Sequence, residues 1–134
     1  RDGRASAGLT MYDMIKFSKA PIIGIVCGKS HTIASLVLQA CKRRYALPHA
    51  ELWPRHLSVA KEIPVSISIS ELDENTDNIL KLVRSQQKKI NEIYQQSTGK
   101  LLHAIRTVLR ANRPMSAEEA REFGLIDEII SEYR

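Results

Sequence analysis

The strongest constraint on how this chain folds is the continuous apolar run of residues 22–27, which ends at Gly28. A short run of this kind is typical of a strand that is covered on both faces. Residues 33–42 follow with apolar side chains at helical spacing, namely Ile33, Leu36, Val37 and Ala40. A strand that turns at a glycine into a helix predicts an α/β layer. The first amides of such a helix point outward, where they can hold an oxyanion or a substrate carbonyl.

Three segments, in this order along the chain, resemble those of one enzyme family. The glycine turn lies in IVCGKSHTIASLVLQACKRRYALPHA. This segment resembles the active-site segment of the proteolytic subunit of the Clp protease, in which a G-x-x-x-S-M turn carries the nucleophilic serine before a KRxxLP strand. The segment ANRPMSAEEAREFGLIDEII resembles the closing segment of that family, in which an aspartate shortly before S-A-x-E-A completes the catalytic triad. The N-terminal RDGRASAGLTMYDMIKFSKAP resembles its SPGGSxxAGLAIYDTM segment.

The resemblance implies an α/β fold of the superhelical βα(β) type that Clp proteolytic subunits share with crotonases. Residues 1–134 would then form a single domain that corresponds to the C-terminal two-thirds of a protomer. Because the family's first strands and helices have no counterpart here, we expect the sequence to be a fragment or a processed product. Its sheet edges would then need to be covered by another polypeptide.

The resemblance also implies a protruding strand-and-helix handle over approximately residues 62–98, by which family members pair two rings face to face. Residues 65–69 alternate apolar and polar side chains as a half-exposed strand does, and residues 77–96 have the pattern of an amphipathic helix. The apolar residues that we assign to the contact between rings are Ile79, Val83, Ile90 and Tyr94. The alternative is an ordinary amphipathic helix that packs on its own domain.

The remaining pattern predicts further helices at residues 6–17 and 101–109, the second with Leu101, Ile105 and Val108 facing inward. Ser116 begins a capping box for a short helix that Gly124 ends, and Gly99 is suited to cap the long helix before it. Short strands are expected at residues 45–47, 51–53 and 125–130.

The resemblance places the oxyanion hole on two backbone amides, those of Gly3 and Ile33. Backbone donors do not depend on the side chains around them. However, the glycine beside Gly3 in the family is here Asp2, whose carboxylate would disfavour an oxyanion.

All three catalytic positions that the resemblance assigns are substituted. The nucleophilic serine aligns with Thr32, whose branched Cβ restricts its hydroxyl and which is also a candidate N-cap of the next helix. The general base aligns with Arg55, and a guanidinium cannot accept a proton. His56 is one residue away, which in a strand places it on the other face unless Pro54 introduces a bulge; His31, beside Thr32, is a poorer candidate.

The orienting aspartate aligns with Asn112. An amide can hold an imidazole but does not stabilise the imidazolium, and in serine proteases this change costs about 10⁴-fold in rate. The three changes together predict a degenerate active site.

We therefore interpret the chain as a noncatalytic structural subunit of a Clp protease core, of the ClpR type found with active subunits in cyanobacteria and plastids. The implied partners are other Clp proteolytic subunits in a hetero-oligomeric double ring, an AAA+ Clp chaperone and unfolded polypeptide substrates. The implied compartment is the chloroplast stroma, or the cytoplasm of a bacterium. The alternatives are an active peptidase that uses Thr32 with His56, and a crotonase-like acyl-CoA enzyme.

Composition argues against several other classes of function. The net charge is +5, but basic and acidic residues are interleaved and only 5% of residues are aromatic, so we expect no specific nucleic-acid binding. Cys27 and Cys41 are not accompanied by ligands at metal-site spacing, and they suit a reducing compartment. We expect no metal and no cofactor. We also expect no membrane span, because the longest apolar run is far shorter than the roughly 20 residues that a span needs.

Overall fold

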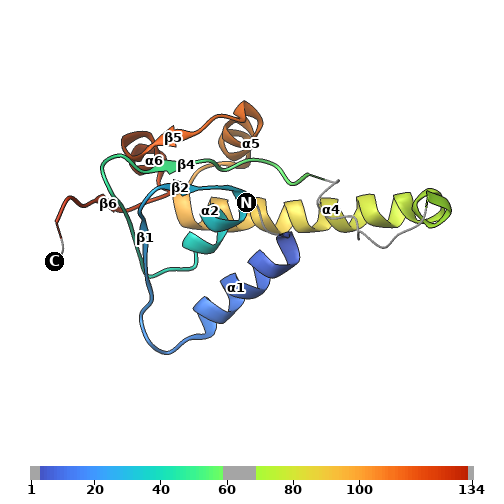
Figure 1. The fold of residues 1–134 in the computed structure, drawn as a ribbon, viewed down its shortest axis with the longest axis horizontal. Coiled ribbons are helices and arrows are strands. Elements are labelled where there is room, and N and C mark those ends of the chain that lie inside the picture. Colours follow the sequence, from blue (N-terminus) through green and yellow to red (C-terminus); the bar gives the residue numbers. More distant parts are fainter. Residues whose placement is uncertain (1–3, 59–68, 133–134) are drawn as a thin grey trace.

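The computed structural model describes residues 4–58 and 69–132. Its helices are α1 (Ala5–Phe17), α2 (Thr32–Leu38), α4 (Ile69–Thr98), α5 (Leu102–Ala111) and α6 (Ala117–Phe123). Its strands are β1 (Ile23–Val26), β2 (Lys29–Ser30), β3 (Arg43–Ala46), β4 (Glu51–Leu52), β5 (Met115–Ser116) and β6 (Glu128–Ile129). Figure 1 shows these elements along the chain, with α4 extending at its N-terminal end well beyond the others.

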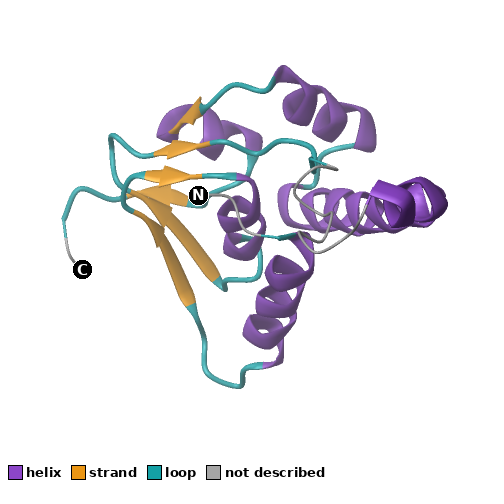
Figure 2. Ribbon diagram, turned by 45° about the vertical axis from the view of Figure 1, so that its right-hand side comes forward, coloured by secondary structure: helices purple, strands orange, loops and turns teal. Residues whose placement is uncertain are grey.

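The described strands form two small sheets, each with three strands. In the first, β1, β3 and β6 run parallel in the order β1-β3-β6, with Gly24 opposite Arg44 and Tyr45 opposite Glu128. In the second, β2 pairs parallel with β4, which pairs antiparallel with β5. The chain crosses from β1 to the parallel strand β3 through α2, as the strand, glycine turn and helix in the sequence predict. The helices and sheets confirm the expected α/β fold (Figure 2).

Helix α1 packs against α2, and a glycine sets how closely they approach. A Cβ added at Gly8 would lie 2.6 Å from Cγ2 of Ile33, which is closer than real Cβ contacts. Any larger residue at position 8 would therefore push α1 away from the helix that begins at the candidate site.

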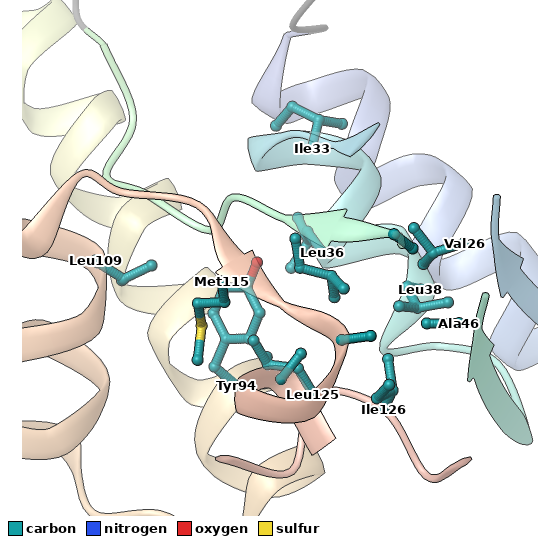
Figure 3. Close-up of a cluster of buried hydrophobic side chains, with 14 of the residues drawn as sticks. Val26, Ile33, Leu36, Leu38, Ala46, Tyr94, Leu109, Met115, Leu125 and Ile126 are labelled. Atoms are coloured by element: carbon teal, nitrogen blue, oxygen red, sulfur yellow. The ribbon is translucent and has the colours of Figure 1, made fainter. Parts of the chain in front are cut away.

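The hydrophobic core lies between the sheets and the helices (Figure 3). Val26 comes from β1, and Leu36 and Leu38 come from α2. Ile105 and Leu109 of α5 pack into the same core. Tyr94 of α4 is fully buried in the same cluster with Met115 and Leu125. Elements from both ends of the described chain thus share one core.

The burial of α4 corrects the expectation that its apolar stripe is an exposed surface. Val83, Ile90 and Tyr94 are only 7%, 3% and 2% exposed, and Ile79 is half-buried. Because Ile90 and Tyr94 belong to the chain's own core, they cannot also be uncovered apolar surface that needs a partner. The alternative interpretation, a helix that packs on its own domain, is correct for this half of α4. The strand expected at residues 65–69 falls on residues 65–68, outside those described, and on Ile69, which begins α4.

Two further expectations about burial are wrong. Strand β1 is covered on one face only, since Ile23 and Ile25 are 56% and 49% exposed while Val26 is buried. Side chains alternate along a strand, so α2 covers one face, and nothing in the described part of the chain covers the other. Leu101, expected to face inward, is 79% exposed because α5 begins only at the next residue.

The caps predicted at Ser116, Gly99 and Gly124 are confirmed. The Ser116 side chain accepts a hydrogen bond from the amide of Glu119, so the cap of α6 forms as the sequence indicates. Gly124 and Gly99 adopt left-handed conformations with φ of +97° and +70° at the ends of α6 and α4. Helix α2 is shorter than predicted, because it ends at Leu38 and residues 39–42 turn into β3.

Candidate functional site

The candidate site is built on the turn between β2 and α2. Strand β2 is held to the segment around β4 by the amide of Glu51, which donates to the carbonyl of Gly28 at 2.9 Å, and by that of Trp53, which donates to Ser30 at 2.7 Å. Inside the turn, the Ser35 hydroxyl donates to the Ser30 carbonyl at 2.8 Å. These contacts fix the start of α2 beside residues 53–55.

His31 is the N-cap residue of α2, in an extended conformation, and Thr32 is the first helical residue. The expectation that Thr32 caps the helix is therefore wrong by one position. The first hydrogen bond of the helix runs from the amide of Ser35 to the carbonyl of His31 at 2.8 Å. The amide of Ile33, assigned to the oxyanion hole, precedes this bond and so has no acceptor within the helix.

The side chains at the nucleophile and base positions are in direct contact. The Nε atom of Arg55 donates a hydrogen bond to Oγ1 of Thr32 at 3.0 Å, and Thr32 is itself buried. The two positions that the resemblance pairs across 23 residues of sequence are thus brought together by the fold. Their chemistry differs from that of a catalytic pair, because Arg55 donates to the hydroxyl and has no lone pair with which to accept its proton.

Trp53 lies beside this pair. The guanidinium carbon of Arg55 is 5.2 Å from the centre of the Trp53 ring. The centre of the His31 ring is 5.5 Å from the centre of the Trp53 ring. A guanidinium over an indole face gains a cation–π attraction, so Trp53 helps to hold Arg55 in place. Among the described residues, nothing accepts a hydrogen bond from the buried indole nitrogen of Trp53. No sequence pattern assigned Trp53 to the site, although its place two residues before Arg55 could have suggested it.

His56 lies against α4 instead. It lines a cavity with Arg84 and Gln87 of α4 and Arg106 of α5, and it forms a side-chain hydrogen bond with Gln87. Burial lowers the pKa of His56, and the charges of Arg110 and Arg106 lower it further, whereas the bond with Gln87 raises it. The adjacent residues Arg55 and His56 therefore have different partners, Thr32 and Gln87.

Asn112 and Gly3 are the two remaining positions that the resemblance assigns to the site. Asn112 ends α5 in a left-handed conformation with φ of 48° and is exposed to solvent. Gly3, the other residue assigned to the oxyanion hole, lies outside the described residues, and so does Asp2.

A comparison with models of protein families identifies the family of this chain. The model of the family described as Clp protease matches residues 2–133. The chain belongs to the Clp protease family. It is accordingly a subunit of a Clp-type proteolytic complex. Clp proteolytic subunits assemble with one another and with AAA+ chaperones.

A polar network that the sequence analysis did not find ties the closing segment of this Clp subunit to β3. Arg44 donates to the Asp127 carboxylate at 2.7 Å, to the carbonyl of Gly124 at 2.9 Å and to the Gln39 side chain at 2.6 Å. Gln39 in turn donates to the carbonyl of Ser35 at 3.0 Å, so the network reaches the turn that carries Thr32. In the sequence, only the aspartate at the end of the family's closing segment, here Asp127, could have indicated this network.

The described residues of this Clp subunit contain no cluster of three or more histidine, cysteine or acidic side chains that could hold a metal ion. Among the described residues, no helix has both the length and the apolar character to cross a membrane.

Proposed function

We propose that this chain is a noncatalytic, ClpR-type subunit of a Clp protease core. It would fill a position in a heptameric ring beside catalytically intact subunits, help to enclose the proteolytic chamber and contribute to docking of the AAA+ chaperone. The observation that carries the proposal is the hydrogen bond from Arg55 to Thr32. A nucleophilic hydroxyl needs a neighbouring base to take its proton, and here a permanently protonated donor occupies that place.

The alternative of an active peptidase that uses Thr32 with His56 finds less support. His56 is engaged with Gln87 on α4, and its lowered pKa gives it a neutral imidazole that has the chemistry of a base but a different partner. For His56 to serve Thr32, residues 54–56 would have to rotate and break the contact of Arg55 with Trp53 as well. The crotonase-like alternative is disfavoured by the family match, which covers nearly the whole chain.

The ClpR type and its place in a mixed ring are proposed from the substituted triad, because a subunit without its own catalytic residues needs active neighbours to serve proteolysis. The chloroplast stroma, or the bacterial cytoplasm, is proposed as the compartment on the same resemblance.

The test is chemical labelling. We expect the purified chain to react with a fluorophosphonate serine-hydrolase probe no more than its Thr32→Val variant does, and to cleave no short fluorogenic peptide. The reason is that the described partner of the Thr32 hydroxyl is Arg55, which is not a base. A catalytically intact Clp proteolytic subunit, treated in parallel, should label strongly. Labelling or peptide cleavage that disappears in Thr32→Val would show an active hydroxyl and reject the noncatalytic assignment.

A further inference from the structure

A basic cavity is lined by His56, the neighbour of the Arg55 that contacts Thr32. Its volume is about 420 Å³, and it opens to solvent between residue 56, α4 and α5. Figures 1 and 2 show the segment after β4 passing between these two helices. A volume of this size is within the range of about 300–1,000 Å³ that is usual for small-molecule sites.

The lining of the cavity has an excess of positive charge. Arg84 and Lys88 come from α4 and Arg106 comes from α5, whereas Glu92 is the only acidic residue among the described residues of the lining. With His56 neutral, three cations and one carboxylate leave two positive charges, the charge that a phosphate dianion would balance. Arg110 adds to the positive potential of the cavity, because its charge helps to lower the pKa of His56.

These cations are not neutralised within the described part of the chain, where Arg84, Lys88, Arg106 and Arg110 form no salt bridge. Arginines elsewhere do pair with carboxylates, as Arg121 does with Glu118 at 2.7 Å. Like charges four residues apart on a helix repel each other, and both α4 and α5 carry such a pair here. A bound anion would relieve this repulsion.

A buried amide supplies an oriented donor in the same cavity. The Gln87 oxygen accepts a hydrogen bond from the amide of Leu57 at 2.8 Å, so its nitrogen donates to the Asn91 oxygen, at 2.9 Å. This leaves the Asn91 nitrogen as a donor with no acceptor among the described residues. Asn91 is only 7% exposed and lines the cavity, so its remaining donor is held beside the cations.

We propose that this cavity binds a small phosphate-bearing molecule. Arg84, Lys88 and Arg106 would contact the phosphate oxygens, and Asn91 would donate to one of them. Guanidinium groups suit this ligand because their fixed donors match the geometry of phosphate oxygens. The source can be free phosphate or a nucleotide, which the probes below distinguish.

The experiment measures binding of pyrophosphate and of ADP to the chain as it is purified, with any accompanying Clp subunits, by calorimetry at constant ionic strength. Lys88→Ala and Arg106→Gln should each weaken binding by about tenfold, as expected for loss of one charge-assisted hydrogen bond. Lys89→Ala is the matched control, since Lys89 is exposed on the same helix and does not line the cavity. Glu92→Gln should tighten binding, because it removes the single negative charge of the lining.

Equal affinities for the two probes would identify the phosphate groups as the ligand, and tighter binding of ADP would identify a nucleotide. The proposal is overturned if neither probe binds, if Lys88→Ala and Lys89→Ala weaken binding equally, or if Glu92→Gln has no effect. None of these results depends on whether Thr32 is catalytic, because the measurement requires no peptidase activity.

Discussion

At the scale of single residues, the contact between Arg55 and Thr32 joins the two side chains that the resemblance assigns to the base and the nucleophile. Their hydrogen bond of 3.0 Å shows that the fold brings these two side chains together. The direction of donation differs from that which a catalytic base would give. A histidine would accept the hydroxyl proton, whereas Arg55 can only donate, and Trp53 holds it in that role.

Arg44 is the other residue on which much depends. Its side chain is only 12% exposed and it joins β3 to the loop after α6 through Asp127. Burial raises the pKa of Asp127, but the hydrogen bonds from Arg44 and the charges of Arg44 and Arg43 outweigh that effect and place the pKa below its usual value. The ionised carboxylate is thus favoured by the folded state.

We predict that Asp127→Asn lowers the free energy of unfolding by about 2 kcal/mol at neutral pH, since it removes charged hydrogen-bond partners of a buried arginine. A lowered carboxyl pKa contributes stability above the unfolded value near pH 4 and loses it as pH falls through the folded value. The difference between the native chain and the variant should therefore shrink below about pH 4. Urea unfolding at several pH values measures it, with the exposed Glu122→Gln as control. A difference that is constant from pH 7 to pH 3 would contradict the prediction.

At the scale of elements, α4 has two parts with different surroundings. Its C-terminal part carries Ile90 and Tyr94 into the core, and its N-terminal end extends beyond the other elements (Figure 1). The C-terminal end of α4 also meets the end of α6. A Cβ on Gly124 would lie 3.1 Å from the carbonyl oxygen of Thr98 and 3.2 Å from its Cα.

This contact predicts different costs for the same substitution at two helix ends. Gly99→Ala should cost about 1 kcal/mol, because alanine is strained at positive φ and the space around it is open. Gly124→Ala should cost roughly 2–3 kcal/mol, because the same strain is joined by a contact with the Thr98 backbone, which cannot move aside freely. Thermal unfolding of the two variants compares them directly. Equal losses would show that the ends of α4 and α6 are not tightly packed.

At the scale of the whole molecule, the described part of the chain leaves several large apolar side chains uncovered. Ile23 and Ile25 lie on the open face of β1, whose second edge pairs with no other described strand. Leu82, on α4, is 55% exposed. An ordinary monomer scatters such residues singly, but a sheet face with an unpaired edge favours association with another chain. These exposed side chains and the unpaired edge of β1, and not the buried stripe of α4, support the proposed assembly.

We predict that Leu82→Asp reduces the size of the particles that contain this chain, while its helix content by circular dichroism is unchanged. The reason is that Leu82 is exposed on α4, the helix assigned to the contact between rings. Sedimentation velocity gives the particle size, and Ser85→Asp, an exposed change of equal charge on the same helix, is the control.

Ile90→Asp should instead unfold the chain, since it buries an unpaired charge in the core. A folded monomer of the unmodified chain would contradict the structural role.

The sequence by itself determined the features that rest on local chemistry. The apolar run before Gly28 and the helical spacing after it predicted β1 and α2, and Ser116, Gly99 and Gly124 marked helix ends that the structure confirms. Periodicity and capping depend on neighbouring residues, so they can be read along the chain. The spacing of motifs also aligned Thr32 with Arg55 across 23 residues, and these two side chains are in contact.

Only the tertiary structure decided which side of each element is covered and which partner each polar side chain has. The stripe of α4 has the same pattern whether another subunit or the chain's own core buries it, and the fold buries Ile90 and Tyr94 internally. The apolar run of β1 predicts two covered faces, but coverage depends on which elements pack there. The network of Arg44 joins residues 83 positions apart, and the cavity beside His56 needs α4, α5 and residue 56 together. Such contacts are set by how the chain returns on itself, which local spacing does not encode.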